Sequence, residues 1–526
     1  CFPRTIRGCL GQSEAVPQCL PFWGFAKLSR QPPRAYGDLA DTTCCMHRAR
    51  KIDVMNVPWS WKTLSEGQVG QIRDAARTFI ETDGFAVRHE GLLARAKAAG
   101  ARVDETSGTV RVPKGLLAEL MEQVPSRYRV ANLLGDAWEI GGESRHGLAI
   151  VTDPWIIDYE TRQPRRPCLE DLRRHTIIAQ RLDPVVGISR MDFPVTDVPG
   201  PTSSLRALEM HLLHHAKHYV VLAANPESFR QWLDIAEIVG RGADPGRLFT
   251  SGVAVGSPLV LNELNAELLL RSLEHGFTVL PTICPMAGAT APYSLAGTLL
   301  ESHIEALMVA LLAQMVRPGA PVQYASGLSV TDMQSGNDLY YTIDKVLWKL
   351  AGVQLGLAEN MPVSAECGGT LTFRYDQQSG AEGMLFMLAA CASGAHVLAG
   401  FGSCYNAVGM SAEMMVIHDA YLRAARHIAR GIRTDDLRLA VANLRRVGPG
   451  GHFLDDDLTL DLLRSDEFFR DESFDFSGGH GESKPLVDRA HERVEELVSD
   501  YQSPVPHDVQ ENLRRYFHDL CAEQEP

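Results

Sequence analysis

The sequence lacks most of the motifs that identify an enzyme class at sight. It has no P-loop (G-x-x-x-x-G-K-[ST]), no dinucleotide fingerprint (G-x-G-x-x-G), no nucleophile elbow (G-x-S-x-G) and no zincin helix (H-E-x-x-H). No two cysteines have the C-x-x-C spacing of zinc ribbons and thioredoxin-type redox sites. These absences argue against P-loop hydrolases, Rossmann dehydrogenases, α/β-hydrolases and zincins.

Excess positive charge and long hydrophobic runs are also missing. The 526 residues include 51 Lys and Arg against 65 Asp and Glu, a formal charge of −14, which argues against a nucleic-acid partner. The purely apolar runs are short, such as Ala306–Leu312, whereas a membrane span needs about 20 residues. With 45% hydrophobic and 22% charged residues, the composition is that of a globular protein with no membrane partner.

Cysteines are concentrated at the start of the chain. Five lie in the first 45 residues and six are scattered over the rest, where they are typical of small buried side chains in a reduced, cytoplasmic protein. The same first segment carries five prolines and shows no helical or strand periodicity. We therefore expect residues 1–50 to be a non-globular extension, with folding beginning near Met46 or Met55.

Residues 51–145 are predicted to form a helix-rich cap. Ser65 is a suitable N-cap for a helix that ends before Gly84, and further helices are expected over Glu90–Ala99 and Lys114–Gln123, with a short strand at Thr109–Val112 between them.

From residue 146 onwards, β-branched runs alternate with long helical patterns. Eight strands are expected, and eight strand–helix repeats predict a (β/α)8 TIM barrel of class α/β over residues 146–436. A doubly wound open sheet is the alternative, although the nucleotide fingerprint that often accompanies it is missing. Residues 437–526 are acidic and helical and are expected to pack on the barrel as a C-terminal extension. The predicted strands are Ala149–Thr152, Val185–Ser189, Tyr219–Ala223, Phe249–Val255, Thr278–Ile283, Pro321–Ala325, Pro362–Glu366 and His396–Ala399.

Four histidines, His211, His214, His215 and His218, recur at helical spacing on one stripe. Such spacing can bind zinc. The stripe, however, precedes a barrel strand, so it belongs to the end of the barrel opposite an active site. We interpret it as a solvated or interface face of a helix and expect no metal site.

Glycines and aromatic residues gather where the predicted strands end. Such runs start at Pro285, Tyr324, Glu366 and Gly400. In a TIM barrel these positions meet at the mouth of the active site. Glycine lets the backbone approach a ligand, and aromatic faces attract a quaternary ammonium by about 0.5–2 kcal/mol each.

Several ordered runs resemble the trimethylamine and glycine betaine methyltransferase (MttB-type) family. The clearest are residues 285–292, 318–322, 376–380 and 447–454. The resemblance extends from about residue 60 to residue 515. It implies a (β/α)8 barrel that passes a methyl group to a corrinoid (cobalamin) cofactor carried by a separate corrinoid protein, since the D-x-H-x-x-G ligand motif of corrinoid binding is absent here.

The resemblance also bears on the substrate. Trimethylamine-specific members carry pyrrolysine, whereas this chain uses the ordinary twenty residues, so it resembles the branch that acts on quaternary amines such as glycine betaine. A quaternary nitrogen is already positive, and the tertiary amine can leave without protonation. We expect no cofactor bound by the chain itself.

On this interpretation Glu366 faces the substrate cation, and the aromatic rings of Tyr324, Phe401 and Tyr405 surround the cation. The Gly368-Gly369 turn or His452 receives a substrate carboxylate. No residue is assigned to the chemical step. The alternatives are a non-catalytic betaine-binding or regulatory barrel and an unrelated zinc-dependent barrel enzyme, and a homo-oligomer stays open.

Overall fold

The computed structural model describes residues 60–190, 195–198, 200–240, 242, 244–478 and 483–524. The extension predicted for residues 1–50 lies outside these ranges and stays a prediction. Of the six scattered cysteines, Cys367, Cys391, Cys404 and Cys521 are buried, as expected, whereas Cys284 is exposed.

Eight parallel strands form a closed ring. Seven belong to one hydrogen-bonded sheet, and residues 321–325 join its two ends, because Val322 bridges Val279 and Tyr324 bridges Val363. Seven of the eight predicted strands are confirmed, with shifted ends, whereas residues 321–325 occupy the eighth position but pair only through these two single bridges. The order in the sheet is β13 (Thr278–Thr282), β11 (Phe249–Ala254), β10 (His218–Val221), β9 (Val185–Arg190), β6 (His146–Ile150), β18 (Val397–Phe401) and β17 (Ser364–Glu366).

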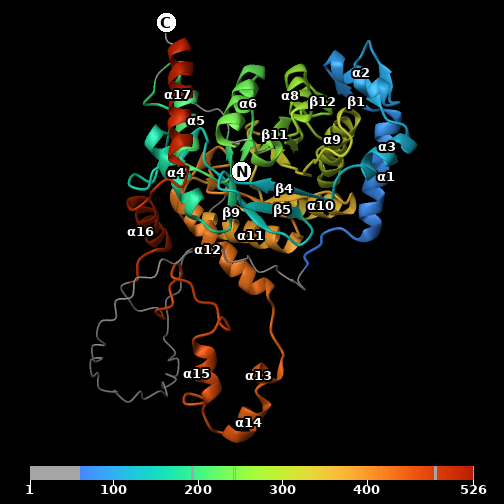
Figure 1. Ribbon diagram of the computed structural model, residues 1–526. Coiled ribbons are helices and arrows are strands. Elements are labelled where there is room, and N and C mark those ends of the chain that lie inside the picture. The colour runs from blue at the N-terminus through green and yellow to red at the C-terminus, as the bar shows by residue number, and fades with distance from the viewer. Residues whose placement is uncertain are drawn as a thin grey trace, which may run out of the picture. The chain divides into compact units, whose positions relative to one another are not determined.

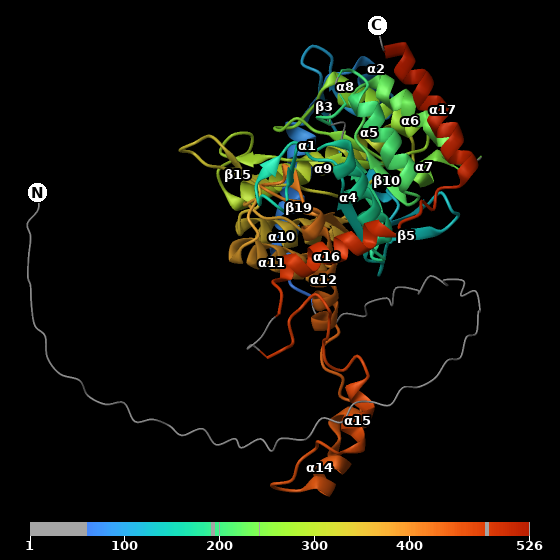
Figure 2. The ribbon, with the colours of Figure 1, turned by 90° about the vertical axis from the view of Figure 1, so that its left-hand side faces the viewer.

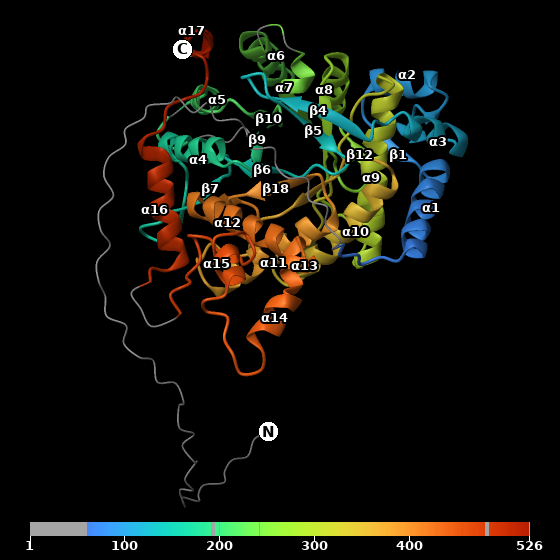
Figure 3. The same cartoon turned by 60° about the horizontal axis from the view of Figure 1, so that its bottom comes forward.

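Helices follow the strands and surround them, as Figure 3 shows. Because each helix returns the chain to the amino end of the next parallel strand, the ring is a (β/α)8 barrel and the doubly wound alternative is wrong. Ser411 caps the last barrel helix by accepting a hydrogen bond from the backbone N–H of Met414. The barrel helices are α4 (Leu169–Arg181), α5 (Ser203–His214), α6 (Pro226–Gly240), α7 (Pro245–Leu248), α8 (Glu263–Glu274), α9 (Leu295–Val316), α10 (Asp344–Ala358), α11 (Gln377–Ser393) and α12 (Ala412–Ala429).

The region before the barrel combines three helices with a small sheet. The predicted helices and strand are present, and Ser65 starts the first helix with a capping box. Strand β12, from the loop after β11, joins this sheet at one edge, and the strand order is β12-β1-β3-β2. The elements are α1 (Glu66–Thr82), β1 (Phe85–Val87), α2 (Glu90–Ala98), β2 (Arg102–Asp104), β3 (Thr109–Arg111), α3 (Lys114–Glu122) and β12 (Val260–Leu261).

Helices α1, α2 and α3 pack on α9, beside which they lie in Figure 1. Helix α9 is covered on nearly all sides, since most of its residues from Thr298 to Gln314 are buried. In the described ranges it alone is long and apolar enough to span a membrane, and 78% of its apolar window is buried inside the protein.

A buried carboxylate joins the N-terminal region to the barrel. The side chain of Glu359 is only 2% exposed. It forms ion pairs with Arg73 at 2.8 Å and with Arg77 at 2.7 Å, and Nε2 of His303, on α9, lies 3.5 Å from its Oε1. Burial favours the protonated carboxyl, but the nearby His303 and the hydrogen bonds from the two arginines outweigh it and hold the pKa of Glu359 well below its usual range.

A hairpin that the sequence analysis did not predict closes the amino ends of the strands. Strands β4 (Arg127–Ala131) and β5 (Ala137–Gly141) precede β6, and Tyr128, Val130 and Ile140 pack on Leu148 and other barrel residues. The Tyr128 hydroxyl donates to Oε1 of Gln323 inside the ring at 2.5 Å. The hairpin fills the amino end of the barrel, so the carboxyl ends are left for a ligand.

The C-terminal region differs along its length. Helices α13 (Asp436–Leu439), α14 (Val441–Val447) and α15 (Asp457–Leu463) bury none of their residues. By contrast, α16 (Leu486–Ser499) packs on α12 and α4, and α17 (His507–Gln524) packs on α5 and α6, as Figure 2 shows for α17.

The histidine stripe is not a solvated face, so that part of the interpretation is wrong, and three of the four side chains pack inside the protein. His211, His215 and His218 are buried, and His218 already belongs to β10. His211 lies between the hydroxyls of Thr152 and Thr176. Within the described ranges no group of three His, Cys, Asp or Glu side chains is placed to hold a metal ion.

Candidate active site

The barrel encloses a cavity of about 580 Å³ at the carboxyl ends of its strands. This volume is typical of sites for small molecules. Its walls are mainly apolar, with side chains such as Ile150, Leu280 and Ile283. The polar groups that line it are therefore few, and each restricts what the cavity can bind.

Two small sheets in the loops after the strands frame this cavity. One supplies Met286 and Asp338 to the lining, and the loop beside the other supplies Asn406, Ala407 and Val408. The first sheet consists of β14 (Met286–Ala287), β15 (Ser329–Thr331) and β16 (Asp338–Leu339), and the second of β19 (Ser403–Cys404), β20 (Gly409–Met410), β7 (Trp155–Ile157) and β8 (Pro164–Arg165).

Glu366, at the carboxyl end of β17, holds two neighbours in place. The Tyr340 hydroxyl donates to its Oε1 at 2.5 Å, and Nζ of Lys345 lies 3.0 Å from its Oε2. The Lys345 ammonium also donates to the carbonyl of Leu328 and lies 2.9 Å from the centre of the Tyr340 ring. Glu366 is thus already paired with a cation, and the face of Tyr340 is occupied.

Asp338 is the carboxylate that is still able to accept a cation. It lines the cavity, and its Oδ1 is buried with no hydrogen-bond partner among the residues that the structure describes. A buried carboxylate oxygen without a partner is unfavourable by itself, so this atom favours a positively charged or hydrogen-donating ligand.

A third acidic side chain, Asp153, follows β6 and is 6% exposed. Burial raises the pKa of this carboxyl well above its usual range, because it disfavours the charged form. Cys284, although its residue is exposed overall, lines the cavity, and the desolvation of its thiol by the surrounding protein raises the pKa to about 11. The cavity environment thus favours the neutral form of both groups, and Asp338 and Glu366 are the other two acidic side chains of the lining.

The chain matches the family model of trimethylamine methyltransferase (MTTB) over residues 42–523. The chain belongs to this family. Its curated relatives include a trimethylamine methyltransferase from Desulfitobacterium hafniense, 24% identical over 459 residues that cover 86% of this chain and 92% of the relative. A glycine betaine methyltransferase from Desulfitobacterium hafniense strain Y51 is 25% identical over 452 residues, which cover 84% of this chain and 94% of the relative.

A solved structure, the monomethylamine methyltransferase of Methanosarcina barkeri, superposes with a TM-score of 0.42 at 12% identity, over 82% of this chain and 92% of that one. From the family match, this protein is a methyltransferase.

In the methyltransferase, Glu366 is the one residue of the predicted pocket that lines the cavity. Tyr324 lies between the barrel and α9, where its hydroxyl contacts Nδ1 of His303 at 3.0 Å. Phe401 is fully buried, with its ring centre 6.5 Å from that of His418 on α12. Both rings fill space between strands and helices, because alternate residues of a strand point to opposite faces.

The other predicted pocket residues also lie outside the lining. Tyr405 packs edge-on against Trp155 and Phe373. The Gly368-Gly369 turn is packed by protein, since a Cβ at Gly369 would lie 2.2 Å from the Tyr341 ring.

His452 lies in the loop between α14 and α15 with its side chain 68% exposed, and it faces Asp455. Because α12 returns to the amino ends of the strands, the segment after it starts at the end of the barrel opposite the cavity.

The sequence analysis missed Asp153, Asp338, Tyr340 and Lys345. Asp153 carried a signal, because it directly follows a predicted strand. The other three belong to a loop sheet and the helix after it, and no strand-end pattern points to them.

Proposed function

We propose that this methyltransferase removes a methyl group from a quaternary amine and passes it to the Co(I) corrinoid of a separate protein. The observation that carries the proposal is the unpartnered carboxylate oxygen of Asp338 in a largely apolar cavity, because the charge attracts a cation and the apolar walls can surround its methyl groups. The glycine betaine methyltransferase among the relatives and the lack of a D-x-H-x-x-G motif support it.

In the reaction the bond between nitrogen and one methyl carbon breaks, and its electron pair stays on nitrogen, so that a neutral tertiary amine leaves. Co(I) supplies the electron pair for the new bond to the methyl carbon. The substrate nitrogen is already positive, so no proton is transferred. The protein's contribution is positioning, which can lower a barrier by about 7–11 kcal/mol when the geometry is in line.

The residues of the cavity divide this task. The Asp338 carboxylate attracts the ammonium group, while apolar walls such as Ile150 and Leu280 exclude water and fit the remaining methyl groups. A partly apolar partner surface suits this end of the barrel, since Val408 of the lining is 41% exposed, and Met333 and Ile343, in the loops before and after β16, are 65% and 59% exposed. We place the docking of the corrinoid protein there.

A substrate screen tests the proposal. Glycine betaine, proline betaine, carnitine, γ-butyrobetaine and choline are each mixed with the enzyme and reduced Co(I) cobalamin, and the methylated corrinoid is followed by its absorption spectrum. We expect at least one of them to react, and trimethylamine to be inert. Methyl transfer from trimethylamine with none from any quaternary amine would contradict the proposal.

The variant Asp338→Asn, measured in the same assay, tests whether the Asp338 carboxylate binds the substrate cation. Loss of the charge should weaken substrate binding about tenfold, close to 1.4 kcal/mol, within the range for hydrogen bonds and contacts to charged groups. Asp332→Asn is the matched control, because Asp332 lies in the loop just before β16, does not line the cavity, and accepts hydrogen bonds from neighbours in its own loop such as Ser335. Equal effects of the two changes would contradict the role of Asp338.

A further inference from the structure

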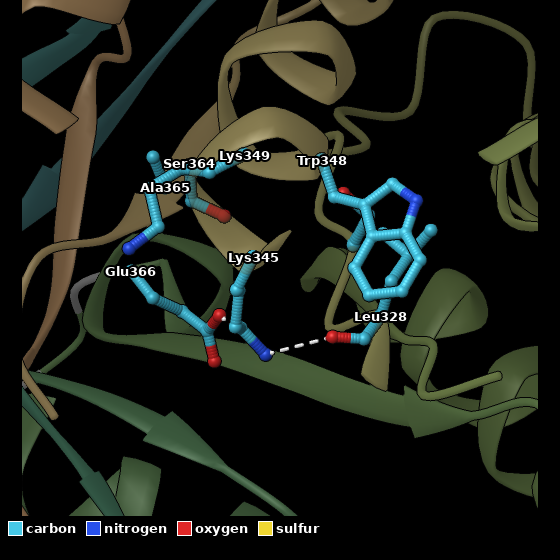
Figure 4. Close-up of a pocket in the computed structure, with 8 residues that line it drawn as sticks. Leu328, Lys345, Trp348, Lys349, Ser364, Ala365 and Glu366 are labelled. Carbon is cyan, nitrogen blue, oxygen red and sulfur yellow. Dashed lines mark hydrogen bonds and ion pairs between the residues drawn. The ribbon is translucent and has the colours of Figure 1, made fainter. Parts of the chain in front are cut away.

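Two lysines extend from one helix toward the end of β17. Lys345 and Lys349 are one turn apart on α10 and are 2% and 6% exposed. In Figure 4 both side chains leave the helix and point toward the strand residues Ser364, Ala365 and Glu366. Burial of two ammonium groups is unfavourable unless each finds a partner.

Only one of the two lysines has such partners. Lys345 is satisfied by Glu366 and the Leu328 carbonyl. Nζ of Lys349 has no hydrogen-bond partner among the described residues, and its closest aromatic neighbour is the Phe386 ring, with 4.5 Å to the ring centre. The protein therefore leaves one buried ammonium with unused donors.

A small cavity of about 10 Å³ lies beside these ammonium groups. Such a volume holds one water or one oxygen-sized group. Ser326, Ser364 and Glu366 line both this cavity and the 580 Å³ cavity, so the two are neighbours. The hydroxyls of Ser326 and Ser364 add donors to those of Lys349.

The charges of this region are unequal. Two ammonium groups face a single carboxylate, Glu366, on the side of α10, whereas the unpartnered carboxylate oxygen of Asp338 lines the larger cavity. An anion next to Lys349 would balance the excess positive charge beside α10. A cation next to Asp338 would balance the negative charge of the larger cavity. A ligand with both charges suits this arrangement better than a simple cation.

We infer that Lys349 receives one carboxylate oxygen of the substrate, and that the enzyme selects zwitterionic betaines over amines without a carboxylate. This inference rests on the proposed function. Lys349 is then a specificity-determining residue, and the Gly368-Gly369 turn and His452 have no part in binding the carboxylate. One carboxylate oxygen occupies the small cavity, while the ammonium group and its methyl groups occupy the large one.

The state of Lys349 gives the inference a pH signature. Burial lowers the pKa of Lys349 to about 8. The positive charge of Lys345 lowers this pKa further, and the negative charge of Glu366 raises it. The titratable groups that face it are Glu366, Lys345 and Cys367. At pH 7 the amine is protonated and can bind an anion. Above about pH 8 it loses its proton, and the affinity for a carboxylate should fall.

Calorimetric binding to the intact protein tests this inference with matched ligands. Glycine betaine and proline betaine are compared with their methyl esters, which keep the ammonium group but lack the negative charge. For the parent we expect the acid to bind at least tenfold more tightly than its ester at pH 7. Lys349→Met should abolish this preference, and Lys349→Arg should restore part of it. Lys114→Met, at an exposed position on α3, is the control and should change nothing.

The outcomes separate this inference from the proposed function. If acid and ester bind and react alike, and Lys349→Met weakens both equally or neither, the carboxylate subsite is wrong while the quaternary-amine activity stands. If no quaternary amine binds or reacts, the proposed function fails. A fold check accompanies the variant, because removal of an unpartnered buried charge should leave the melting temperature unchanged or higher. A lower melting temperature would contradict the unpartnered state of Lys349.

Discussion

Replacement of Glu366 by Gln should destabilise the protein more than replacement of its cationic partner. Glu366→Gln keeps the shape and the acceptor for the Tyr340 hydroxyl but removes the charge that balances Lys345. Two buried ammonium groups, at positions 345 and 349, are then left without a carboxylate on their side of the cavity. Lys345→Met leaves Glu366 alone, but this carboxylate is 21% exposed and keeps its bond from Tyr340.

The magnitude follows from the geometry. At 3.0 Å and an effective dielectric constant of 20, the attraction between the two charges is about 5–6 kcal/mol. Loss of one partner of a buried pair costs about 3–5 kcal/mol. Because Glu366 is partly exposed and Gln still accepts hydrogen bonds, we expect a loss of about 2–3 kcal/mol for Glu366→Gln and about 1 kcal/mol for Lys345→Met.

Urea unfolding of both single variants and of the double variant provides the assay. We expect the double variant to be more stable than Glu366→Gln alone, since the uncompensated ammonium of Lys345 has been removed. The two changes are then non-additive, as is typical of residues in contact. Additive losses in the double variant, or a Glu366→Gln protein as stable as the parent, would refute the description of this pair.

Two further predictions concern the frame of the site. Glu359→Gln should lower the stability by about 2–4 kcal/mol at pH 7, because it removes the buried partner of the half-buried Arg73 and Arg77. Since the folded pKa of Glu359 is lowered, its contribution is present above about pH 4.5 and is lost as the pH falls, so acid titration of the unfolding free energy should show a weaker slope in the variant. Gly369→Ala should strongly lower the melting temperature, because the backbone has φ +118° and the new Cβ would meet the Tyr341 ring. Gly319→Ala is the control, since Gly319 has φ +78° with open space around it, and this change should cost only about 1 kcal/mol. Equal losses for the two variants would contradict the close packing at Gly369.

The barrel could be predicted from sequence because its signal repeats. Eight β-branched runs separated by helical patterns leave few alternatives, and even residues 321–325, which close the ring through single bridges, were identified. The hairpin at the amino end was missed, since Tyr128 and Ile140 lie in short strands among turn residues. Its role depends on contacts with Leu148 and Gln323, which are distant in the sequence.

The candidate site was less accessible to sequence analysis. Glu366 was identified because it ends a strand and points into the ring. Tyr324 and Phe401 lie at similar strand ends, but the parity of the strand turns them outward, and a β-bulge between Ala399 and Phe401 shifts the register there. Lys349 reaches the site from a helix behind the strands, which no strand-end pattern can indicate.

The central claim is methyl transfer from a quaternary nitrogen, and isotope transfer tests it most directly. The enzyme is incubated with Co(I) cobalamin and glycine betaine or proline betaine that carries trideuterated N-methyl groups, and both products are analysed by mass spectrometry. The account predicts one trideuteromethyl group on cobalt for each molecule of tertiary amine formed from at least one of the two betaines. Demethylated amine without label on cobalt, or no demethylation of either betaine, would contradict it.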